Sequence, residues 1–353
     1  MSLSSSSCGV AVRKTFRREP PSVFYLIPDY DRPSWGIGLL YSHVRLLRRH
    51  GINAYVLHHK APFSITWLEA EVPVTHLDNL SLRICEQDIL VVPEILAREG
   101  QAICDKCRRV VFVQGSFLIL QPFEEAFEYS ALGYEAALAV MPHTREIVER
   151  YFGIEARVVP PFIASYFFAS EEELTNKKRH RRILLFPKPG YREAGYYDYD
   201  IVKKLLMRGC KKKTQGKAEW ELLEVCGRGH REVSALMRKS AFLVSVNCLE
   251  AFNTTVPEAM AAGCIPVCYE AYGGKDFLVD RYNAYVFPNN YVYSLINTML
   301  ELMDNYDSLQ DELTRLRANA HRTACKYREE ETERALVDFY RSLGIRVGHD
   351  GSA

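Results

Sequence analysis

The chain of 353 residues is 48% hydrophobic and 25% charged, ordinary values for a globular protein with room for about two domains. Its formal net charge of +1 gives no general attraction to nucleic acid, and no apolar run approaches the ~18 residues of a membrane span. The start of the chain lacks the apolar core of a secretory signal, so we expect a disordered tail over residues 1–20 rather than a transit peptide. The ten cysteines are scattered, several in apolar runs, as expected of reduced thiols in a cytoplasmic protein.

The first half of the chain alternates apolar strands with helical patterns. Residues 23–27 are continuously apolar, which is typical of a strand buried on both faces of a parallel sheet. A loop containing Gly36 and Gly38 leads into a helical pattern that extends to about residue 49, and a strand follows at residues 54–57. Further strands are predicted at residues 88–92, 109–113, 137–141 and 156–159, with helices at 94–99 and 144–152.

The same alternation resumes after Pro160 and Pro161, which predict a hinge. Strands are predicted at residues 182–186, 220–226, 242–246, 265–269 and 285–287, with helices at 201–207, 233–238, 255–263, 291–305 and 308–343, the last of them long and broken. Two such halves predict an α/β fold with two Rossmann-like, doubly wound parallel-sheet domains that face a cleft. We expect an N-terminal domain over residues 21–162, a C-terminal domain over residues 163–326 and a final helix over residues 327–345.

The most informative stretch leads from a strand through a polar loop into the helix at residues 255–263. Glu250 lies in the loop and Glu258 in the first helical turn, so both carboxylates can face one ligand at the carboxyl end of the strand. Asn253 and Thr254 come just before the helix, where unpaired backbone N–H groups favour an anion by about 0.3–1 kcal/mol. The alternative is that Glu258 only caps its helix and Glu250 is a solvated loop charge.

This stretch resembles the GT-B glycosyltransferases, close to the retaining enzymes of family 4. The resemblance is carried by Glu250 and Glu258, by the continuation Ala-Met-Ala-Ala-Gly-Cys-Ile-Pro-Val over residues 259–267, by Gly273 and Gly274, and by the helix over residues 232–241. Family members often have Glu-Gly-Phe-Gly where this chain has Glu-Ala-Phe-Asn. The first half matches only in its order of elements. The resemblance implies the GT-B fold, with the final helix crossing back to the N-terminal domain.

The resemblance also implies roles for individual residues. Glu250 would contact hydroxyls of the donor sugar and Glu258 would hold the nucleotide ribose, since a carboxylate accepts two hydroxyl hydrogen bonds of roughly 1.5–3 kcal/mol each. Lys188 and Arg192, which follow the first strand of the second half, would neutralise the diphosphate leaving group. The backbone N–H groups near Asn253 would add to that phosphate site. The alternative for the basic pair is a solvated loop.

Several turn residues complete the predicted site. Gly227 and Arg228 would line the pocket for the base, and Gln114, at a strand end of the first half, would lie beside the reacting sugar. Gly36 and Gly38 would let the backbone approach the donor, although one Gly-x-Gly is a weak nucleotide signal and a tight turn is the simpler interpretation.

We expect no metal and no cofactor, because the basic pair replaces the metal of other glycosyltransferases. Asp29 and Asp31 have the spacing of a metal-binding Asp-x-Asp but lie in the first loop of the wrong half. The adjacent histidines His58 and His59 are predicted to lie on the surface. Arginines 45, 48 and 49 share one helical face, which is either a solvated face or a peripheral membrane contact.

The leading hypothesis is a retaining glycosyltransferase of polysaccharide biosynthesis. It would move a hexosyl group from a nucleotide-diphosphate sugar to a glycan or glycoconjugate acceptor. The alternatives are an inactive sugar-nucleotide-binding protein of the same fold and a GT-B-fold nucleotide-sugar epimerase. A nicotinamide dehydrogenase is disfavoured, because it would need a fuller Gly-x-Gly-x-x-Gly followed by an acidic residue.

Overall fold

The computed structural model describes residues 20–68, 71–177, 179–188, 195–212 and 219–348. These residues form two compact units. The first unit holds the described residues of Met1–Ala139, Arg145–Val159 and Glu333–Ala353, and the second those of Val140–Thr144 and Pro160–Thr332. The chain therefore leaves the first unit near Pro160 and returns to it at Glu333.

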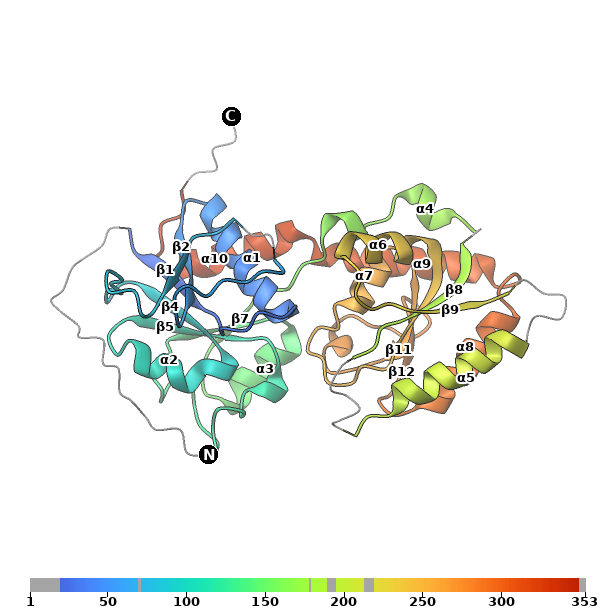
Figure 1. Cartoon of the computed structure of the whole chain (residues 1–353), viewed down its shortest axis with the longest axis horizontal. Coiled ribbons are helices and arrows are strands. Elements are labelled where there is room, and N and C mark those ends of the chain that lie inside the picture. Colours follow the sequence, from blue (N-terminus) through green and yellow to red (C-terminus); the bar gives the residue numbers. More distant parts are fainter. Residues whose placement is uncertain (1–19, 69–70, 178, 189–194, 213–218, 349–353) are drawn as a thin grey trace. The chain divides into compact units, whose positions relative to one another are not determined.

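The first unit is built on a seven-stranded parallel sheet with the strand order β3-β2-β1-β4-β5-β6-β7. Helices α1 and α10 cover one face of this sheet and α2 and α3 the other (Figure 1). The strands are β1 (Ser22–Leu26), β2 (Asn53–His58), β3 (Val74–His76), β4 (Ile89–Pro93), β5 (Arg108–Val113), β6 (Ala136–Ala139) and β7 (Ala156–Val158). The helices are α1 (Trp35–Arg49), α2 (Ala97–Ile103), α3 (Pro142–Tyr151) and α10 (Glu329–Ser342), with short 3-10 turns η1 (Glu94–Leu96) and η2 (Ser116–Leu118).

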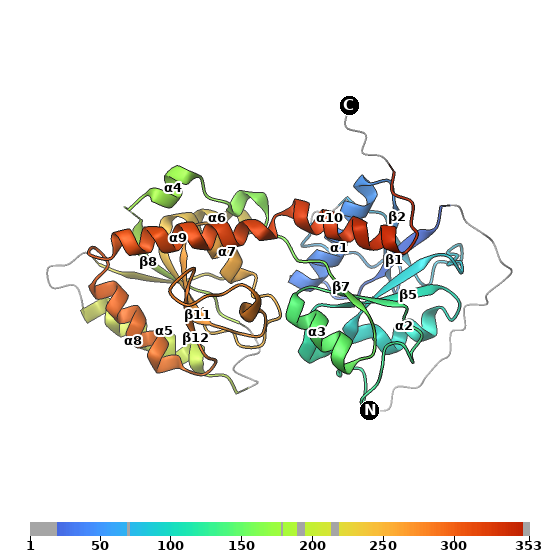
Figure 2. The ribbon, with the colours of Figure 1, turned by 180° about the vertical axis from the view of Figure 1, so that it is seen from behind.

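The second unit is built on a five-stranded parallel sheet with the order β12-β11-β10-β8-β9. Helices α5 and α8 lie side by side on one face, and α6, α7 and α9 lie on the other (Figure 2). The strands are β8 (His180–Leu185), β9 (Glu221–Glu224), β10 (Ser240–Ser245), β11 (Ile265–Tyr269) and β12 (Tyr285–Phe287). The helices are α4 (Glu171–Thr175), α5 (Asp198–Lys212), α6 (His230–Lys239), α7 (Thr255–Ala261), α8 (Val292–Asp304) and α9 (Gln310–Ala324), with 3-10 turns η3 (Ser165–Phe167), η4 (Gly273–Asp276) and η5 (Cys325–Tyr327).

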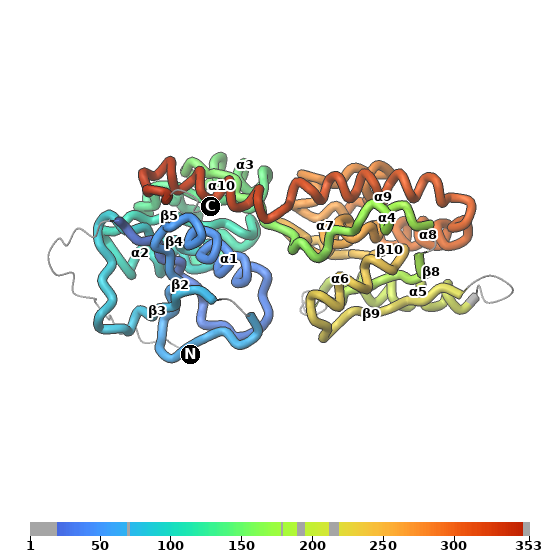
Figure 3. Tube along the Cα trace, turned by 90° about the horizontal axis from the view of Figure 1, so that it is seen from above, coloured from blue at the N-terminus to red at the C-terminus, as the bar shows by residue number. Residues whose placement is uncertain are grey.

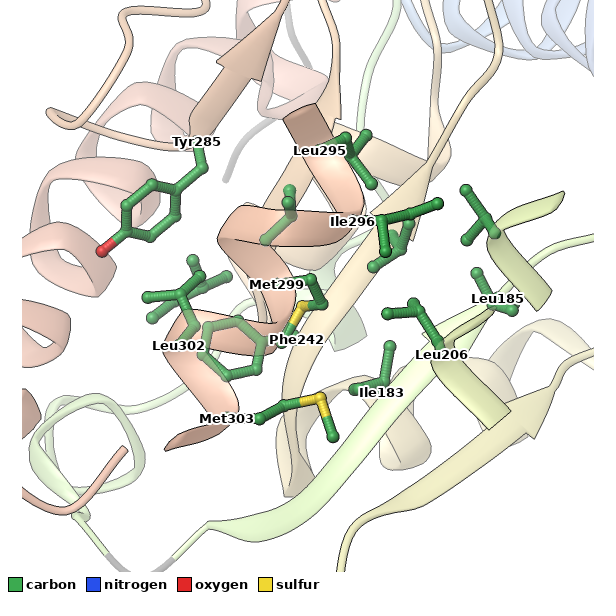
Figure 4. Close-up of a cluster of buried hydrophobic side chains, with 14 of the residues drawn as sticks. Ile183, Leu185, Leu206, Phe242, Tyr285, Leu295, Ile296, Met299, Leu302 and Met303 are labelled. Carbon is green, nitrogen blue, oxygen red and sulfur yellow. The ribbon is translucent and has the colours of Figure 1, made fainter. Parts of the chain in front are cut away.

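The sequence pattern explains both sheets. Strands β1, β4, β10 and β11 are buried along their whole length, as continuous apolar runs in a doubly covered parallel sheet should be. In the second unit the side chains of α8 pack against those of β8 and β10, including Met299 of the helix and Ile183 and Phe242 of the strands (Figure 4). The prediction of an α/β fold with two Rossmann-like parallel sheets is confirmed.

The end of the chain is divided between the two units. The helical segment expected to be broken within residues 308–343 is divided by the 3-10 turn η5 and the extended residue Arg328, which separate α9 from α10. Helix α9 lies on the second unit and α10 on the first (Figure 3). The buried Tyr340 hydroxyl donates to the Tyr25 hydroxyl of β1 at 2.9 Å, and Glu333 lies 3.0 Å from the His50 imidazole.

Two predictions about exposure are wrong. His58 is buried rather than on the surface, because its Nε2 faces the Tyr41 hydroxyl at 2.8 Å and its Nδ1 lies 3.1 Å from Asp29 Oδ1. Asp29 also accepts the backbone N–H of His59 at 3.0 Å, so this carboxylate fixes the end of β2. Cys226, expected inside a strand, is exposed, because β9 ends at Glu224.

Candidate functional site

The carboxyl ends of β8 and β10 bring together two of the predicted site residues. Lys188 follows β8 and Glu250 follows β10, and the Lys188 ammonium forms an ion pair with Glu250 Oε1. The lysine side chain is 44% exposed and the glutamate 19%. Because the pair is reached from solvent, its unused N–H donors and carboxylate lone pairs are available to a ligand. Arg192, the other member of the predicted basic pair, lies outside the described residues.

The Glu250 backbone is fixed by the glycine turn of η4. The Gly273 N–H donates to the Glu250 carbonyl at 3.0 Å. A Cβ atom at Gly273 would lie 1.5 Å from the Ala251 carbonyl oxygen, so no residue with a side chain fits without moving the backbone. The glycine pair that contributed to the sequence resemblance therefore has a physical task, which is to let η4 pack against the Glu250 loop.

Glu258 is the buried carboxylate of the second unit. It lies in the first turn of α7, is 7% exposed, and its Oε1 is 3.1 Å from Nε2 of His230, the first residue of α6. His230 Nδ1 faces the Tyr166 hydroxyl of η3 at 3.0 Å. Burial raises the pKa of Glu258, while the hydrogen bond to Glu258 raises the pKa of His230. Three segments far apart in sequence thus meet around one carboxylate.

Asn253 and Thr254 form the turn between β10 and α7. The buried Asn253 amide donates to the Ser245 hydroxyl at 3.0 Å, which ties the loop to the end of β10. The Thr254 carbonyl accepts the Glu258 N–H at 3.0 Å as the first bond of the helix. These two bonds therefore anchor the segment that lies between Glu250 and Glu258.

The predicted base-pocket residues lie between β9 and α6. Gly227 has a φ of +63°, a left-handed conformation that favours glycine, with no atom within 4 Å of its Cβ position. The Arg228 guanidinium pairs with Glu232 in the first turn of α6. This pair directs Arg228 toward α6, and the contacts that join Lys188 to Glu250 and Glu258 to His230 do not include it.

In the first unit, the structure brings Gln114 and Gly36 together. Gln114 Nε2 donates to the Gly36 carbonyl at 3.3 Å, and a Cβ at Gly36 would lie 2.3 Å from Gln114 Oε1. The carboxylate of Glu94, which follows β4, accepts the backbone N–H groups of Gln114 at 3.1 Å and Gly115 at 2.7 Å. A Cβ at Gly38, two residues further along the same helix, would make an ordinary contact with the Trp67 ring at 3.9 Å. These contacts hold the strand-end loop that carries Gln114.

Sequence reasoning missed three residues of these clusters. Glu94 had a signal, because it directly follows an apolar strand, as the Glu250 loop does. Tyr166 and His230 had none, because their importance comes from contact with Glu258 alone.

Within the described residues, no group of three or more histidine, cysteine or acidic side chains could hold a metal ion. None of the helices that the structure describes is long and apolar enough to span a membrane.

Comparisons with known proteins give one family model that matches part of the chain and several solved structures with a similar fold. Residues 213–323 match the family model described as glycosyl transferases group 1, whereas no curated protein sequence gives a significant match. The fold is similar to that of sucrose-phosphate synthase from Thermosynechococcus elongatus, with a TM-score of 0.68 and 11% identity over 92% of this chain and 99% of that one. It is also similar to Anabaena HepE in complex with UDP-glucose (0.63; 13% identity; 91% and 100%) and to the lipopolysaccharide outer core galactosyltransferase WaaB (0.60; 11%; 91% and 99%). The chain therefore has the fold of the GT-B glycosyltransferases, and residues 213–323 of its second half match the glycosyl transferases group 1 model.

Proposed function

We propose that the protein is a retaining glycosyltransferase that uses a nucleotide-diphosphate sugar as its donor and a glycan or glycoconjugate as its acceptor. The observation that carries this proposal is the Lys188–Glu250 ion pair at the carboxyl ends of β8 and β10, in the same unit as the buried Glu258. Ligands of open α/β sheets bind at these strand ends. A cation beside two carboxylates supplies groups for a diphosphate, a sugar and a ribose.

The roles follow from charge and exposure. In the transfer, the bond between the donor's anomeric carbon and its phosphate oxygen breaks, and a bond to the acceptor oxygen forms. The nucleoside diphosphate leaves with the electron pair, and the acceptor's hydroxyl proton is released. The Lys188 ammonium would stabilise the charge that develops on the diphosphate, and Glu250 would accept hydrogen bonds from the sugar hydroxyls.

Donor binding would depend on the buried carboxylate. Glu258 would accept the ribose hydroxyls, and the Gly227–Arg228 turn would lie beside the base. Arg192 would assist Lys188, and the N–H groups near Asn253 and Thr254 would face phosphate. In the first unit, Gln114, Gly36 and Gly38 would contribute on the side of the reacting sugar and acceptor. Because HepE was solved with UDP-glucose, uridine nucleotides are the first donors to test.

Two substitutions separate the proposed roles. Glu258→Ala should raise the dissociation constant of UDP by about 10-fold or more, because charged hydrogen bonds are worth roughly 1.5–3 kcal/mol. Glu250→Ala should mainly lower kcat, because its contacts strengthen as charge develops in the transition state. Calorimetry with UDP, UMP, GDP and ADP, followed by sugar-release kinetics with the preferred nucleotide's sugars, measures both effects.

The matched control is Glu301→Ala, which removes an exposed carboxylate of α8 in the same unit. It should change neither quantity. Binding of no nucleotide in the panel by the wild type would overturn the proposed function. Nucleotide binding without any sugar transfer or release would favour the inactive binding protein.

A further inference from the structure

A chain of hydrogen bonds leads from the surface of the second unit to the buried carboxylate of Glu258. The Tyr166 hydroxyl lies 3.0 Å from His230 Nδ1, and His230 Nε2 lies 3.1 Å from Glu258 Oε1. The imidazole also packs edge-on against the Phe167 ring, with centroids 5.2 Å apart. The contacts therefore fix the ring at both of its nitrogen atoms and against the Phe167 ring.

These contacts determine the proton positions on the imidazole. An ionised carboxylate only accepts hydrogen bonds, so His230 Nε2 must carry the proton that faces Glu258. In the neutral ring Nδ1 is then an acceptor, and the Tyr166 hydroxyl is the group placed to donate to it. Tyr166 thus selects the tautomer in which a neutral histidine can donate to Glu258.

Glu258 depends on this donor. Its side chain is almost completely buried, and burial raises the pKa of its carboxyl group, which favours the neutral form. The His230 hydrogen bond and charge act in the opposite direction. Only Oε1 is used by the imidazole, so Oε2 and a lone pair of Oε1 can still accept hydrogen bonds.

We propose that His230 is a positioning residue for donor binding, which holds the Glu258 carboxylate as an acceptor for the ribose hydroxyls of a ribonucleoside diphosphate, with Tyr166 fixing its tautomer. This inference rests on the proposed function and deepens it. His230 itself does not touch the reacting atoms. Its side chain is 59% exposed, so the incoming nucleotide can reach the carboxylate beside it.

The other charged groups near the histidine do not replace it. The Arg231 guanidinium lies over the Tyr166 ring, 4.6 Å from its centroid, and Arg228 pairs with Glu232. Neither arginine forms a salt bridge with Glu258, whose ion-pair partner among the described residues is His230. Loss of the imidazole should therefore leave the Glu258 carboxylate buried without its side-chain hydrogen-bond donor.

The test compares UDP with 2′,3′-dideoxy-UDP by calorimetry. The wild type should prefer UDP, because only UDP offers ribose hydroxyls to Glu258. His230→Phe should lose most of that preference, with a roughly 10-fold or greater weakening of UDP binding and little change for the dideoxy form. His230→Gln, which keeps an N–H donor, should restore part of the preference, and Tyr166→Phe should reduce it less than His230→Phe.

The pH dependence distinguishes positioning from simple packing. Without the imidazole, the pKa of Glu258 should rise further, so the loss of UDP affinity on acidification should begin at higher pH in His230→Phe than in the wild type. His180→Phe, at an exposed histidine that begins β8, is the matched control and should keep the wild-type profile. Equal UDP preference and an equal pH profile in the wild type, His230→Phe and Tyr166→Phe would overturn the inference.

Three further outcomes are separable. If His230→Phe fails to fold, His230→Gln and Tyr166→Phe decide the question by the same comparison. If the wild type binds GDP or ADP instead of UDP, the same comparison is made with that nucleotide and its dideoxy form, and if it binds no nucleotide of the panel, the proposed function is overturned and the inference falls with it. If the wild type binds both forms equally, Glu258 does not read the ribose, and the inference is overturned although the protein binds nucleotide.

Discussion

Each unit contains a buried carboxylate near its sheet, but the two are held in different ways. Glu94, which is 2% exposed in the first unit, accepts the backbone N–H groups of Gln114 and Gly115. Glu258 in the second unit is held by the His230 side chain. Burial raises the pKa of both, that of Glu94 to about 7.

The partner, rather than the burial, separates a structural carboxylate from one that can serve a ligand. The backbone N–H groups cannot leave Glu94 unless the loop after β5 unfolds, so its Oε1, which accepts both of them, is committed to that loop. The side chains of His230 and Lys188 are 59% and 44% exposed, and they can share their carboxylates with an arriving molecule. We therefore propose that Glu94 shapes the first unit and that the carboxylates of the second unit serve donor binding.

The largest effect should follow the loss of the Lys188 ammonium group. Lys188→Ala should lower kcat by about 10²–10³-fold, the range found when one group that stabilises transition-state charge is removed. Steady-state kinetics with the donor chosen by the nucleotide panel measure this. Lys177→Ala, which breaks an exposed ion pair with Asp311 in the same unit, should leave kcat unchanged. A Lys188 variant as active as this control would remove the lysine from the mechanism.

The next effect concerns Glu94 and stability. Its pKa is raised on folding from about 4.5 to about 7, so the native state binds more protons than the unfolded state between these values. The protonated form is thus favoured by folding, and this stabilisation, present below about pH 4.5, is lost as the pH rises through 7. The loss should reach about 3 kcal/mol by pH 8.

Glu94→Gln tests that linkage, because its amide oxygen can accept the same backbone N–H groups without titrating. Urea unfolding of the wild type and the variant at pH 5 and pH 8 should show the wild type losing about 3 kcal/mol more than the variant. Glu301→Gln, at an exposed position of α8, should behave as the wild type. Parallel pH profiles of stability for Glu94→Gln and the wild type would show that folding does not raise the pKa of Glu94.

A smaller effect is the loss of stability when one glycine of each unit is replaced by alanine. Gly273→Ala should destabilise the fold by roughly 1–3 kcal/mol, because its Cβ meets the Ala251 backbone carbonyl. Gly36→Ala should cost less, since its Cβ meets the end of the flexible Gln114 side chain. Thermal unfolding of both variants measures the difference. If the two variants melt together, η4 does not fix the Glu250 loop by close packing.

The smallest expected effect is that of chelation. If Lys188 and Arg192 carry the charge that a divalent ion carries in other enzymes, EDTA should leave kcat unchanged within error. Activity that disappears with EDTA and returns with Mg²⁺ or Mn²⁺ would contradict the metal-free proposal. A requirement for Mg²⁺ would also change the meaning of the Lys188 result, since the lysine would then share its task.

The sequence by itself determined the fold class and the candidate residues of the second unit. Continuous apolar runs separated by helical patterns are local signals. They predicted two parallel sheets, because a strand that is covered on both faces is apolar along nearly its whole length. Glu250, Glu258, Gly273 and Lys188 could be selected because each lies at a fixed distance from a strand or turn. Their spacing along the sequence can be recognised without knowledge of any tertiary contact.

Only the tertiary structure decided which side chains meet. His230 reaches Glu258, Glu94 reaches the loop of Gln114, and His58 is buried against Tyr41, each across a long stretch of chain. No local pattern encodes these contacts, because a side chain's partner depends on how separate helices and loops pack around the ends of a sheet. Burial then sets the proton affinity of each carboxylate, since the cost of removing charge from water depends on the whole surroundings rather than on the neighbouring residues in sequence.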